Sequence, residues 1–316
     1  MIQKRTIGIV GAGHVGMAAA YAVFLRGLAG EIIVVDQDHR RAEGEAMDLM
    51  HGQAFVERVS VRAGEYADLA AAQVVVISAG VAQKPDETRL ALLNRNAAVL
   101  RQIIAQLDAH TPGSVLIIAS NPVDILTHVT QALTRRPAGL VIGTGTMLDT
   151  ARFRALLGDY YGVDPRSVHA YILGEHGDSE VPIWSSAHIG GVPLMDNTIL
   201  GKTFAREEME RIFQSVRHAA YEILSRKGYT NTAIGSSIAR LVEAILDDQR
   251  SVLPVSRQLT GQHGIDGVCL SIPSIIGQQG VTDALLLRLN DVELDGLRYS
   301  AQVLRESLQG IQVQAE

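Results

Sequence analysis

The sequence is poor in cysteine and in lysine. Cys269 is the one cysteine among 316 residues, which excludes an intrachain disulfide and a multi-cysteine metal site. We therefore expect no bound metal, and we expect a reducing compartment, for which the cytoplasm is the simplest choice. Arginine supplies nearly all of the 28 basic side chains. Its planar guanidinium group favours two-pronged recognition of anions where several arginines converge.

Excess positive charge is also lacking. The formal net charge of −6 argues against a general nucleic-acid-binding protein, which is usually basic. Residues 6–25 form a nearly apolar run that follows Lys4 and Arg5. Such a run is typical of a signal peptide or a membrane anchor. Four glycines in its first half suit a spanning helix poorly, and no second membrane segment follows. A strand, a turn and a helix explain the run better, so we expect neither membrane nor nucleic acid as a partner.

The amino-terminal segment matches a dinucleotide-binding unit. A β-rich run, Thr6–Val10, is followed by Gly11-Ala12-Gly13-His14-Val15-Gly16, which fits the pattern G-x-G-x-x-G. The glycines permit a tight turn, let a pyrophosphate approach the backbone and allow close helix–strand packing. A helix is predicted at Met17–Arg26, and its N-terminus favours an anion. A second strand is predicted at Glu31–Asp36.

The acid that ends this second strand indicates which dinucleotide is bound. Asp36 stands where a carboxylate bonds the adenosine ribose, and this favours NAD over its phosphorylated analogue. Arg40 and Arg41 leave room for the phosphorylated form, although they also fit the solvated start of a helix. The whole spaced unit is far more specific than a lone glycine motif.

Strands and helices continue to alternate. We predict strands at Val59–Ala63, Val74–Ser78, Ser114–Ala119 and Leu140–Gly143, and helices at Arg41–Gln53 and Arg89–His110. This order implies a parallel, doubly wound sheet that binds ligands at the carboxyl ends of its strands. The loops at Gly11, Gly80 and Asn121 all leave such ends, so they should face one crevice.

The pattern changes after residue 145. We predict a helix from the segment Gly145–Arg154, a hairpin at Gly190-Gly191, a helix at Thr203–Lys227, strands at Ser251–Thr260, Val268–Ile276 and Val281–Leu289, and a last helix carrying Leu294 to Ile311. Strands without intervening helices are expected to be antiparallel. The predicted fold class is α/β: a Rossmann doubly wound parallel sheet in an NAD-binding domain, 1–145, followed by an α+β catalytic domain, 146–316, with antiparallel strands.

A histidine in a glycine-rich turn is the main candidate for proton transfer. His176 follows the predicted strand Val168–Leu173 and lies between Gly174 and Gly177. An imidazole so placed suits proton exchange near neutral pH. If the Asp149 carboxylate bonds one ring nitrogen, it fixes the tautomer and stabilises the imidazolium. A plain structural turn is the alternative.

Two arginines and an asparagine are further candidates. Arg152, three residues after Asp149, can clamp a substrate carboxylate with two hydrogen bonds. Arg89 ends a glycine-containing loop and can polarise a carbonyl as the site closes. Each arginine also fits a charge on a helix surface, and Asn121 fits a turn residue before Pro122.

Several motifs, taken in this order, resemble the L-lactate dehydrogenase family over nearly the whole chain. The matching segments are Gly11–Gly16, Ala82–Leu90, Ser120–Asp124, Gly145–Arg152 and Gly174–Ser179. The resemblance implies that His176 is the general acid/base and Asp149 its partner. It also implies that Arg152 clamps the carboxylate and that Arg89 is the mobile polarising residue. The implied substrate-binding positions are Gln83, Arg89, Asn121, Asp149, Arg152 and Thr230. The implied positions for the cofactor NAD are Gly11, Gly13, Val15, Gly16, Asp36, Arg41, Tyr66, Gly80, Val81, Gln102, Ala119, Asn121 and Thr144.

Gln83 distinguishes the two substrates that the resemblance suggests. The related malate dehydrogenases carry an arginine there, which pairs the second carboxylate of oxaloacetate. A neutral Gln83 supplies no such charge, so a 2-oxo acid with one carboxylate is expected. The expected reaction is the reversible reduction of pyruvate to L-lactate, with malate or another 2-hydroxy acid as the alternative. Asp86 stands where the family usually has glycine, so the speed of loop closure is not carried over.

The resemblance also suggests regulation and assembly. Arg154 and His169 match positions that bind fructose 1,6-bisphosphate between subunits in many bacterial members, and unremarkable surface cations are the alternative. A homotetramer is expected. The first predicted strand begins near residue 5, so the N-terminal arm of the vertebrate enzymes is expected to be absent. A hypothesis of another class is a dinucleotide-binding protein without turnover, because a fold alone does not establish activity.

Overall fold

The computed structural model describes residues 5–81 and 87–311. The strands of its first half are β1 (Thr6–Val10), β2 (Glu31–Val35), β3 (Ser60–Ala63), β4 (Ala72–Ile77), β5 (Val115–Ile118) and β6 (Val141–Gly143). The helices of that half are α1 (His14–Leu25), α2 (His39–His51), α3 (Arg89–His110) and α4 (Val123–Leu133). The second half contains α5 (Met147–Tyr161), β7 (Val168–Leu173), β8 (Val181–Ile189), β9 (Val192–Pro193), β10 (Thr198–Ile199), β11 (Lys202–Thr203), α6 (Arg206–Lys227), α7 (Thr232–Leu246), β12 (Ser251–Thr260), β13 (Asp266–Gly277), β14 (Gly280–Ala284) and α8 (Asp291–Leu308). Short 3-10 turns connect these elements: η1 (Gln53–Phe55), η2 (Tyr66–Ala71), η3 (Ala138–Leu140), η4 (Pro165–Ser167) and η5 (Gln262–Gly264).

A nine-stranded sheet forms the centre of the molecule. Its strand order is β14-β13-β12-β6-β5-β4-β1-β2-β3, and β6 to β3 in this order are parallel. β1 pairs with both β2 and β4, so the chain reverses its direction of winding at the β1/β4 boundary. This is the Rossmann order, with its ligand crevice at the reversal point. The predicted fold class is confirmed.

Alternating side chains of the parallel strands build a separate core on each face. Ile7 and Ile9 of β1 pack with residues of α1 and α7, whereas Val10 packs with residues of α3 and α4. In β4, Val74 and Val76 belong to the first core and Val75 and Ile77 to the second. Strands that are buried on both faces need no polar side, which explains their continuous apolar runs.

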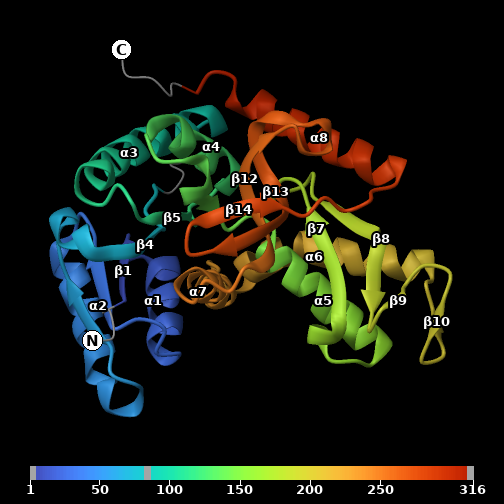
Figure 1. Ribbon diagram of the computed structural model, residues 1–316, viewed down its shortest axis with the longest axis horizontal. Helices are drawn as coiled ribbons and strands as arrows, with labels where there is room; N and C mark the ends of the chain where they lie inside the picture. Colours follow the sequence, from blue (N-terminus) through green and yellow to red (C-terminus); the bar gives the residue numbers. More distant parts are fainter. Residues whose placement is uncertain (1–4, 82–86, 312–316) are drawn as a thin grey trace.

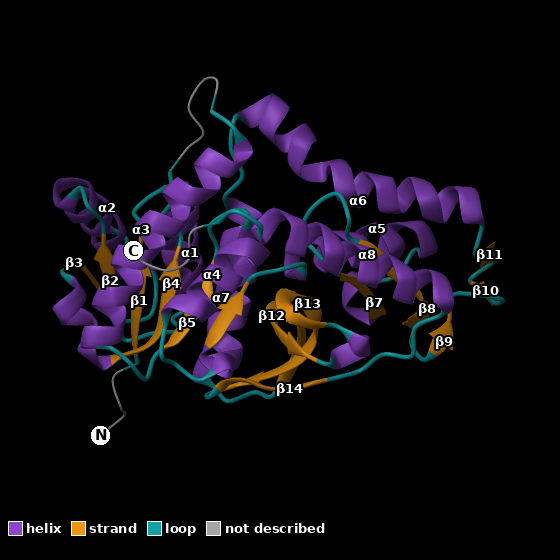
Figure 2. Cartoon of the chain, turned by 90° about the horizontal axis from the view of Figure 1, so that it is seen from above, coloured by secondary structure: helices purple, strands orange, loops and turns teal. Residues whose placement is uncertain are grey.

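The antiparallel strands continue the same sheet. β12 pairs with β13 and β13 with β14, both antiparallel as predicted. β12 also pairs with the edge strand of the parallel part through Ser256 and Gly143. The edge of β6 is therefore covered. Figure 2 shows β12, β13 and β14 between the parallel strands and the small sheet at the other end of the molecule.

That small sheet carries the turn that contains His176. β7, β8 and β9 form an antiparallel sheet, and β8 and β9 meet as the hairpin predicted at Gly190-Gly191. α5 and α6 pack against it through Phe153, Leu157 and Val216. Figure 1 shows this unit on the right, opposite α1 and α2, with α7 between them.

Two helices were not predicted. α4 begins directly after Pro122, in a stretch interpreted only as a turn. α7 lies between the predicted helix ending at Lys227 and the predicted strand at Ser251. The amino-terminal strand, turn and helix are confirmed, although α1 begins at His14 rather than at Met17. No helix among residues 5–81 and 87–311 is long and apolar enough to cross a membrane.

Candidate active site

The three predicted loops meet at the carboxyl ends of the parallel strands. Gly11 adopts φ +107°, and a Cβ there would lie 2.7 Å from the Ala79 nitrogen. Only glycine fits that approach. The Ser78 hydroxyl donates to the Gly11 carbonyl at 3.0 Å, and the Ser120 hydroxyl donates to the Ala79 carbonyl at 2.6 Å. The loops after β1, β4 and β5 therefore share one crevice.

The phosphate loop leaves room for a ligand. A Cβ built on Gly13 would meet no atom within 4 Å, so the backbone there faces open space. Gly13 is also the N-cap of α1 and supplies no capping side chain. Backbone N–H groups at a helix N-terminus favour an anion such as pyrophosphate. A Cβ on Gly16 would lie 2.0 Å from the Gly11 carbonyl, which is the close packing expected of the third glycine.

Asp36 closes one side of this loop. Its carboxylate accepts from the Ala12 N–H at 2.6 Å and from the Asp38 N–H at 2.9 Å. Tyr66 lies close enough for the charge of Asp36 to act on its hydroxyl. Burial first and this charge second raise the pKa of Tyr66. Arg41 lies in the first turn of α2, exposed to solvent.

The remaining cofactor candidates lie on several elements of the first half of the chain. Val81 donates its N–H to the Asn96 side chain at 3.0 Å, which fixes the loop that leaves Gly80. Ala119 and Thr144 follow β5 and β6 directly and bond back to the neighbouring strands through Ile77 and Ile118. Val15 is half-buried in the first turn of α1. Gln102 lies midway along α3 with an exposed side chain.

His176, Asp149 and Arg152 are brought together. His176 Nδ1 lies 2.6 Å from one oxygen of the Asp149 carboxylate, and Arg152 donates to the other at 2.8 Å. Asp149 is 3% exposed, so both charge-assisted hydrogen bonds are shielded from water. The His176 ring retains an exposed fraction of 27%. The ring is therefore bonded to Asp149 on its Nδ1 side and reaches solvent in part.

The backbone of the histidine turn is held by buried side chains. The His176 N–H donates to the Asp124 carboxylate at 2.7 Å, and the Glu175 N–H donates to the Ser300 hydroxyl at 2.6 Å. Gly174 bridges to Ser271 of β13. Asp124 begins α4 and Ser300 lies in α8. Elements from both halves of the chain therefore position the imidazole.

The charges around the ring decide its protonation. Burial disfavours the imidazolium, but the charge and hydrogen bond of Asp149, with Asp124 and Glu180 beyond, outweigh it and raise the pKa of His176 to about 9. Burial likewise opposes ionisation of Asp149, yet His176 and Arg152 hold the pKa of that carboxyl below its ordinary value. The free site therefore favours an ion pair with a protonated ring.

Two buried carboxyls beside His176 were not among the predicted site residues. Asp124 is 2% exposed, and burial, only partly offset by its hydrogen bonds, raises its pKa to about 6. Glu180 is 6% exposed; burial first and the Asp149 charge second raise its pKa. Asp124 ends the motif Ser120–Asp124, and Glu180 directly follows the motif Gly174–Ser179. What marks these two carboxyls is their burial next to the His176 ring. This burial results from the folding of distant segments, so the sequence alone does not reveal it.

The structure describes only some of the other predicted residues. Gln83 and Asp86 lie outside the described residues. Arg89 is the first residue of α3, and its side chain also lies outside them. Asn121 is exposed at the end of β5, and Thr230 is half-buried between α6 and α7.

α6 is tied to the histidine turn through Asp178. The Tyr221 hydroxyl donates to the Asp178 carboxylate at 3.2 Å, and Arg217 donates to the Asp178 carbonyl at 3.4 Å. The helix that leads to Thr230 is thus anchored beside His176.

The candidate effector residues also converge. Arg154 donates to the Ala170 carbonyl at 2.9 Å, and its guanidinium stacks over Tyr171 at 4.9 Å. The His169 ring lies 4.7 Å from that of His188, and their planes are 19° apart. Burial, then His188 and Arg154, lowers the pKa of His169. His188, which the sequence did not single out, therefore adds a third potential cation to this cluster. Among the described residues, no group of side chains suits a metal ion.

These two regions define the class of protein: a Rossmann-fold dehydrogenase with a nucleotide crevice and an acid–imidazole pair. The chain matches the family models for the lactate/malate dehydrogenase NAD binding domain at residues 5–143 and alpha/beta C-terminal domain at residues 146–314. It therefore belongs to the lactate/malate dehydrogenase family, as an NAD-dependent enzyme of the L-lactate dehydrogenase type. The predicted resemblance and the NAD cofactor are confirmed.

Individual relatives are similar to this chain along almost their entire length. The L-lactate dehydrogenase of Salinibacter ruber is 60% identical over 308 residues, which are 97% of this chain and 98% of that protein. The L-lactate dehydrogenase of a Synechococcus strain is 46% identical over 96% and 98% of the two chains. The crystal structure of the minor L-lactate dehydrogenase from Enterococcus mundtii has 41% identity and a TM-score of 0.94, covering 99% of this chain and 100% of that one.

Proposed function

We propose that this enzyme reversibly reduces pyruvate to L-lactate with NADH, and that His176 is its general acid/base. The observation that carries the proposal is the bonding of His176 and Arg152 to opposite oxygens of one buried carboxylate. A proton donor and a carboxylate-binding cation are thereby fixed side by side. Bound NADH supplies the hydride that passes to C2 of the 2-oxo acid.

Each residue then has a separate task. The His176 imidazolium donates its proton to the oxygen that develops charge, and Asp149 stabilises the imidazolium beforehand. Arg152 binds the substrate carboxylate, which fixes C2 relative to the ring. Arg89 polarises the carbonyl, and Asn121 and Thr230 contact the substrate. In lactate oxidation the neutral imidazole accepts the proton.

We propose that the cofactor contacts are the loop and strand-end residues described above. Gly11, Gly13, Val15 and Gly16 surround the pyrophosphate, and Asp36 bonds the adenosine ribose. The remaining contacts are Arg41, Tyr66, Gly80, Val81, Gln102, Ala119, Asn121 and Thr144. The open space above Gly13 supports this assignment.

A substrate comparison tests the proposal. NADH oxidation is measured with pyruvate and with oxaloacetate, for the wild type and for His176→Ala. We expect faster turnover of pyruvate and loss of activity in the variant. Faster turnover of oxaloacetate would identify a malate dehydrogenase instead. Absence of 2-oxo acid turnover in the wild type would leave a dinucleotide-binding protein.

We further propose that the chain assembles as a homotetramer in the cytoplasm and that Arg154 and His169 bind fructose 1,6-bisphosphate. The cluster of Arg154, His169 and His188 supports the anion site. Large apolar side chains on α1, α2 and η1 support self-association: Tyr21, Leu25, Met47 and Phe55 are all more than half exposed. We propose the domain division after residue 145, where Gly145 turns with φ +50° between β6 and α5.

A further inference from the structure

An aromatic stack joins the phosphate loop to the segment that carries Thr230. The rings of His14 and Tyr229 have centroids 4.0 Å apart and planes within 8° of each other. His14 directly follows Gly13 and begins α1, whereas Tyr229 directly precedes Thr230. A residue of the cofactor loop is therefore in face-to-face contact with a neighbour of a proposed substrate contact.

Among residues 5–81 and 87–311, few other side-chain contacts hold the segment around Tyr229. Gly228 ends α6 with φ +85°, and Tyr229 itself is 37% exposed. The Lys227 ammonium lies 4.7 Å from the centre of the Tyr229 ring and donates to the Asn231 side chain at 2.6 Å. A surface segment held by such contacts depends on each of them for its position.

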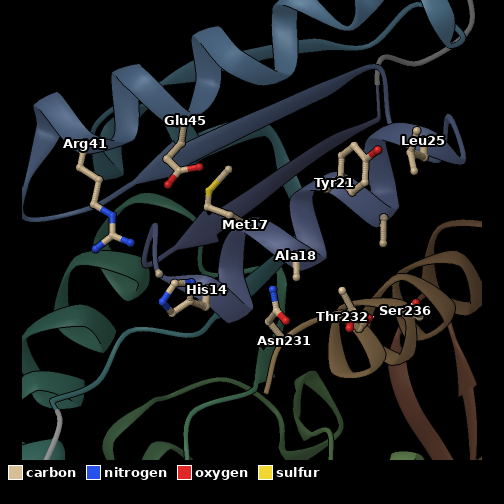
Figure 3. Close-up of a pocket in the computed structure, with 12 residues that line it drawn as sticks. His14, Met17, Ala18, Tyr21, Leu25, Arg41, Glu45, Asn231, Thr232 and Ser236 are labelled. Carbon is tan, nitrogen blue, oxygen red and sulfur yellow. Dashed lines mark hydrogen bonds between the residues drawn. The ribbon is translucent and has the colours of Figure 1, made fainter. Parts of the chain in front are cut away.

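The far end of the segment is fixed to α1. Asn231 is the N-cap of α7, and α7 packs so closely on α1 that a Cβ on Gly235 would lie 2.7 Å from the Ala18 backbone. Figure 3 shows His14 and Asn231 beside each other, with Thr232 and Ser236 of α7 lining the same pocket. The start of α1 and the start of α7 are therefore packed against each other, and the ring of Tyr229 stacks on the His14 ring at the start of α1.

We propose that His14 is a positioning residue that couples the cofactor loop to substrate binding. Its ring holds Tyr229, and Tyr229 holds Thr230 at the substrate, so ordering of the Gly11–Gly16 loop by the dinucleotide also orders the substrate segment. His14 does not touch the substrate. The inference rests on the proposed function, because it takes Thr230 as a substrate contact. Stacked aromatic pairs are strong enough to bias such a segment several-fold.

A double-mutant cycle tests the coupling. His14→Ala is expected to lower kcat/KM for pyruvate about three- to tenfold. We expect the loss mainly in KM, with the Kd for NADH from fluorescence titration within about twofold of the wild type. His14→Phe keeps a ring and should restore most of the lost efficiency. In His14→Ala/Tyr229→Leu the two losses should not add, because both variants remove the same stack.

The controls separate this role from a general loss of structure. His110→Ala removes another exposed imidazole, at the end of α3, and should leave both constants unchanged. Tyr229→Phe keeps the stacked ring and should retain the efficiency that Tyr229→Leu loses. The inference is overturned if the losses of the single variants add, if the Phe variant at position 14 does not recover, or if NADH affinity falls in step with pyruvate. If the wild type reduces oxaloacetate in place of pyruvate, the proposed function fails, and the same cycle run with oxaloacetate still decides the role of His14.

Discussion

A single buried carboxylate organises the chemistry at the scale of residues. Asp149 bonds the imidazole with one oxygen and a guanidinium with the other. Either cation alone would leave a lone pair of a nearly inaccessible group unmatched, which is costly. The pair also places the proposed proton donor beside the proposed carboxylate clamp, so one side chain sets both their orientation and their charge.

Removal of this charge gives the first prediction. Asp149→Asn keeps the shape but removes the anion that opposes the burial of His176. The pKa of His176 should therefore fall from about 9, and kcat/KM for pyruvate should fall by a factor on the order of 10²–10⁴. Steady-state kinetics and the pH profile measure both. Asp295→Asn, at an exposed ion pair on α8, is the control and should change neither. Retention of wild-type kinetics by the Asp149 variant would contradict the role.

The direction of pH dependence gives the second prediction. The pKa of His176 is raised from 6.5 to about 9, so the imidazolium is fully present near pH 6.5 and is lost as the pH rises through 9. In the proposed mechanism the reduction of pyruvate requires the imidazolium, so kcat/KM for pyruvate should be flat around neutrality and fall near pH 9. Oxidation of lactate requires the neutral ring, so kcat/KM for lactate should rise over the same interval. Initial rates in both directions measure these two pH profiles. If both profiles changed slope near pH 6.5 instead, Asp149 would not stabilise the charged ring.

The candidate catalytic and substrate-binding residues were easier to predict from the sequence than the residues that hold them in position. His176, Asp149 and Arg152 stand in motifs with fixed spacing, and the fold brings them together. Asp124 holds the backbone of His176 from a helix that was not predicted. Such supports depend on burial and on contacts between distant segments, which residue spacing alone does not reveal.

At the scale of elements, the close approach of α1 and α7 holds the phosphate loop. Gly235 of α7 faces the Ala18 backbone of α1, and a Cβ would lie 2.7 Å from it. Backbone atoms cannot move aside as a flexible side chain can, so any larger residue must push the helices apart. α7 was not predicted from the sequence, and so the role of this glycine was not visible there.

This packing gives the third prediction. Gly235→Ala should destabilise the fold by about 1–3 kcal/mol, despite the higher helix propensity of alanine. Because α1 carries the phosphate loop, the Kd for NADH should also rise. Thermal unfolding and fluorescence titration measure the two effects. Gly44→Ala, in α2, is the matched control: a Cβ there meets no atom within 4 Å, so it should stabilise the protein by roughly 0.5–1 kcal/mol. Equal effects of the two substitutions would contradict the packing argument.

At the scale of the whole molecule, one sheet connects the two halves of the chain. The alternation of elements predicted the parallel strands, and the lack of helices between β12, β13 and β14 predicted their antiparallel pairing. The pairing of Ser256 with Gly143 was not predicted, because it joins strands far apart in the sequence without a turn between them. This contact explains how β13, through Ser271, reaches the turn that carries His176.

The proposed anion site gives the last prediction, which concerns the assembled molecule. Arg154, His169 and His188 place basic side chains on α5, β7 and β8, outside the parallel sheet. Burial first, and then the charges of His188 and Arg154, lower the pKa of His169. A multivalent phosphate offsets these charges and gains charge-assisted hydrogen bonds. If it binds between subunits, it also favours the assembled form by mass action.

Fructose 1,6-bisphosphate should therefore lower the apparent KM for pyruvate and shift the sedimentation profile towards the tetramer. Arg154→Ala should abolish both effects while leaving kcat without the effector within about twofold, since Arg154 bonds Ala170 rather than the His176 turn. Arg166→Ala is the matched control, because that exposed arginine pairs only with its neighbour Asp164 among the described residues. An unchanged response of Arg154→Ala to the bisphosphate would place the effector elsewhere. A wild type that ignores the bisphosphate would reduce Arg154 and His169 to structural cations of the β7–β8 sheet.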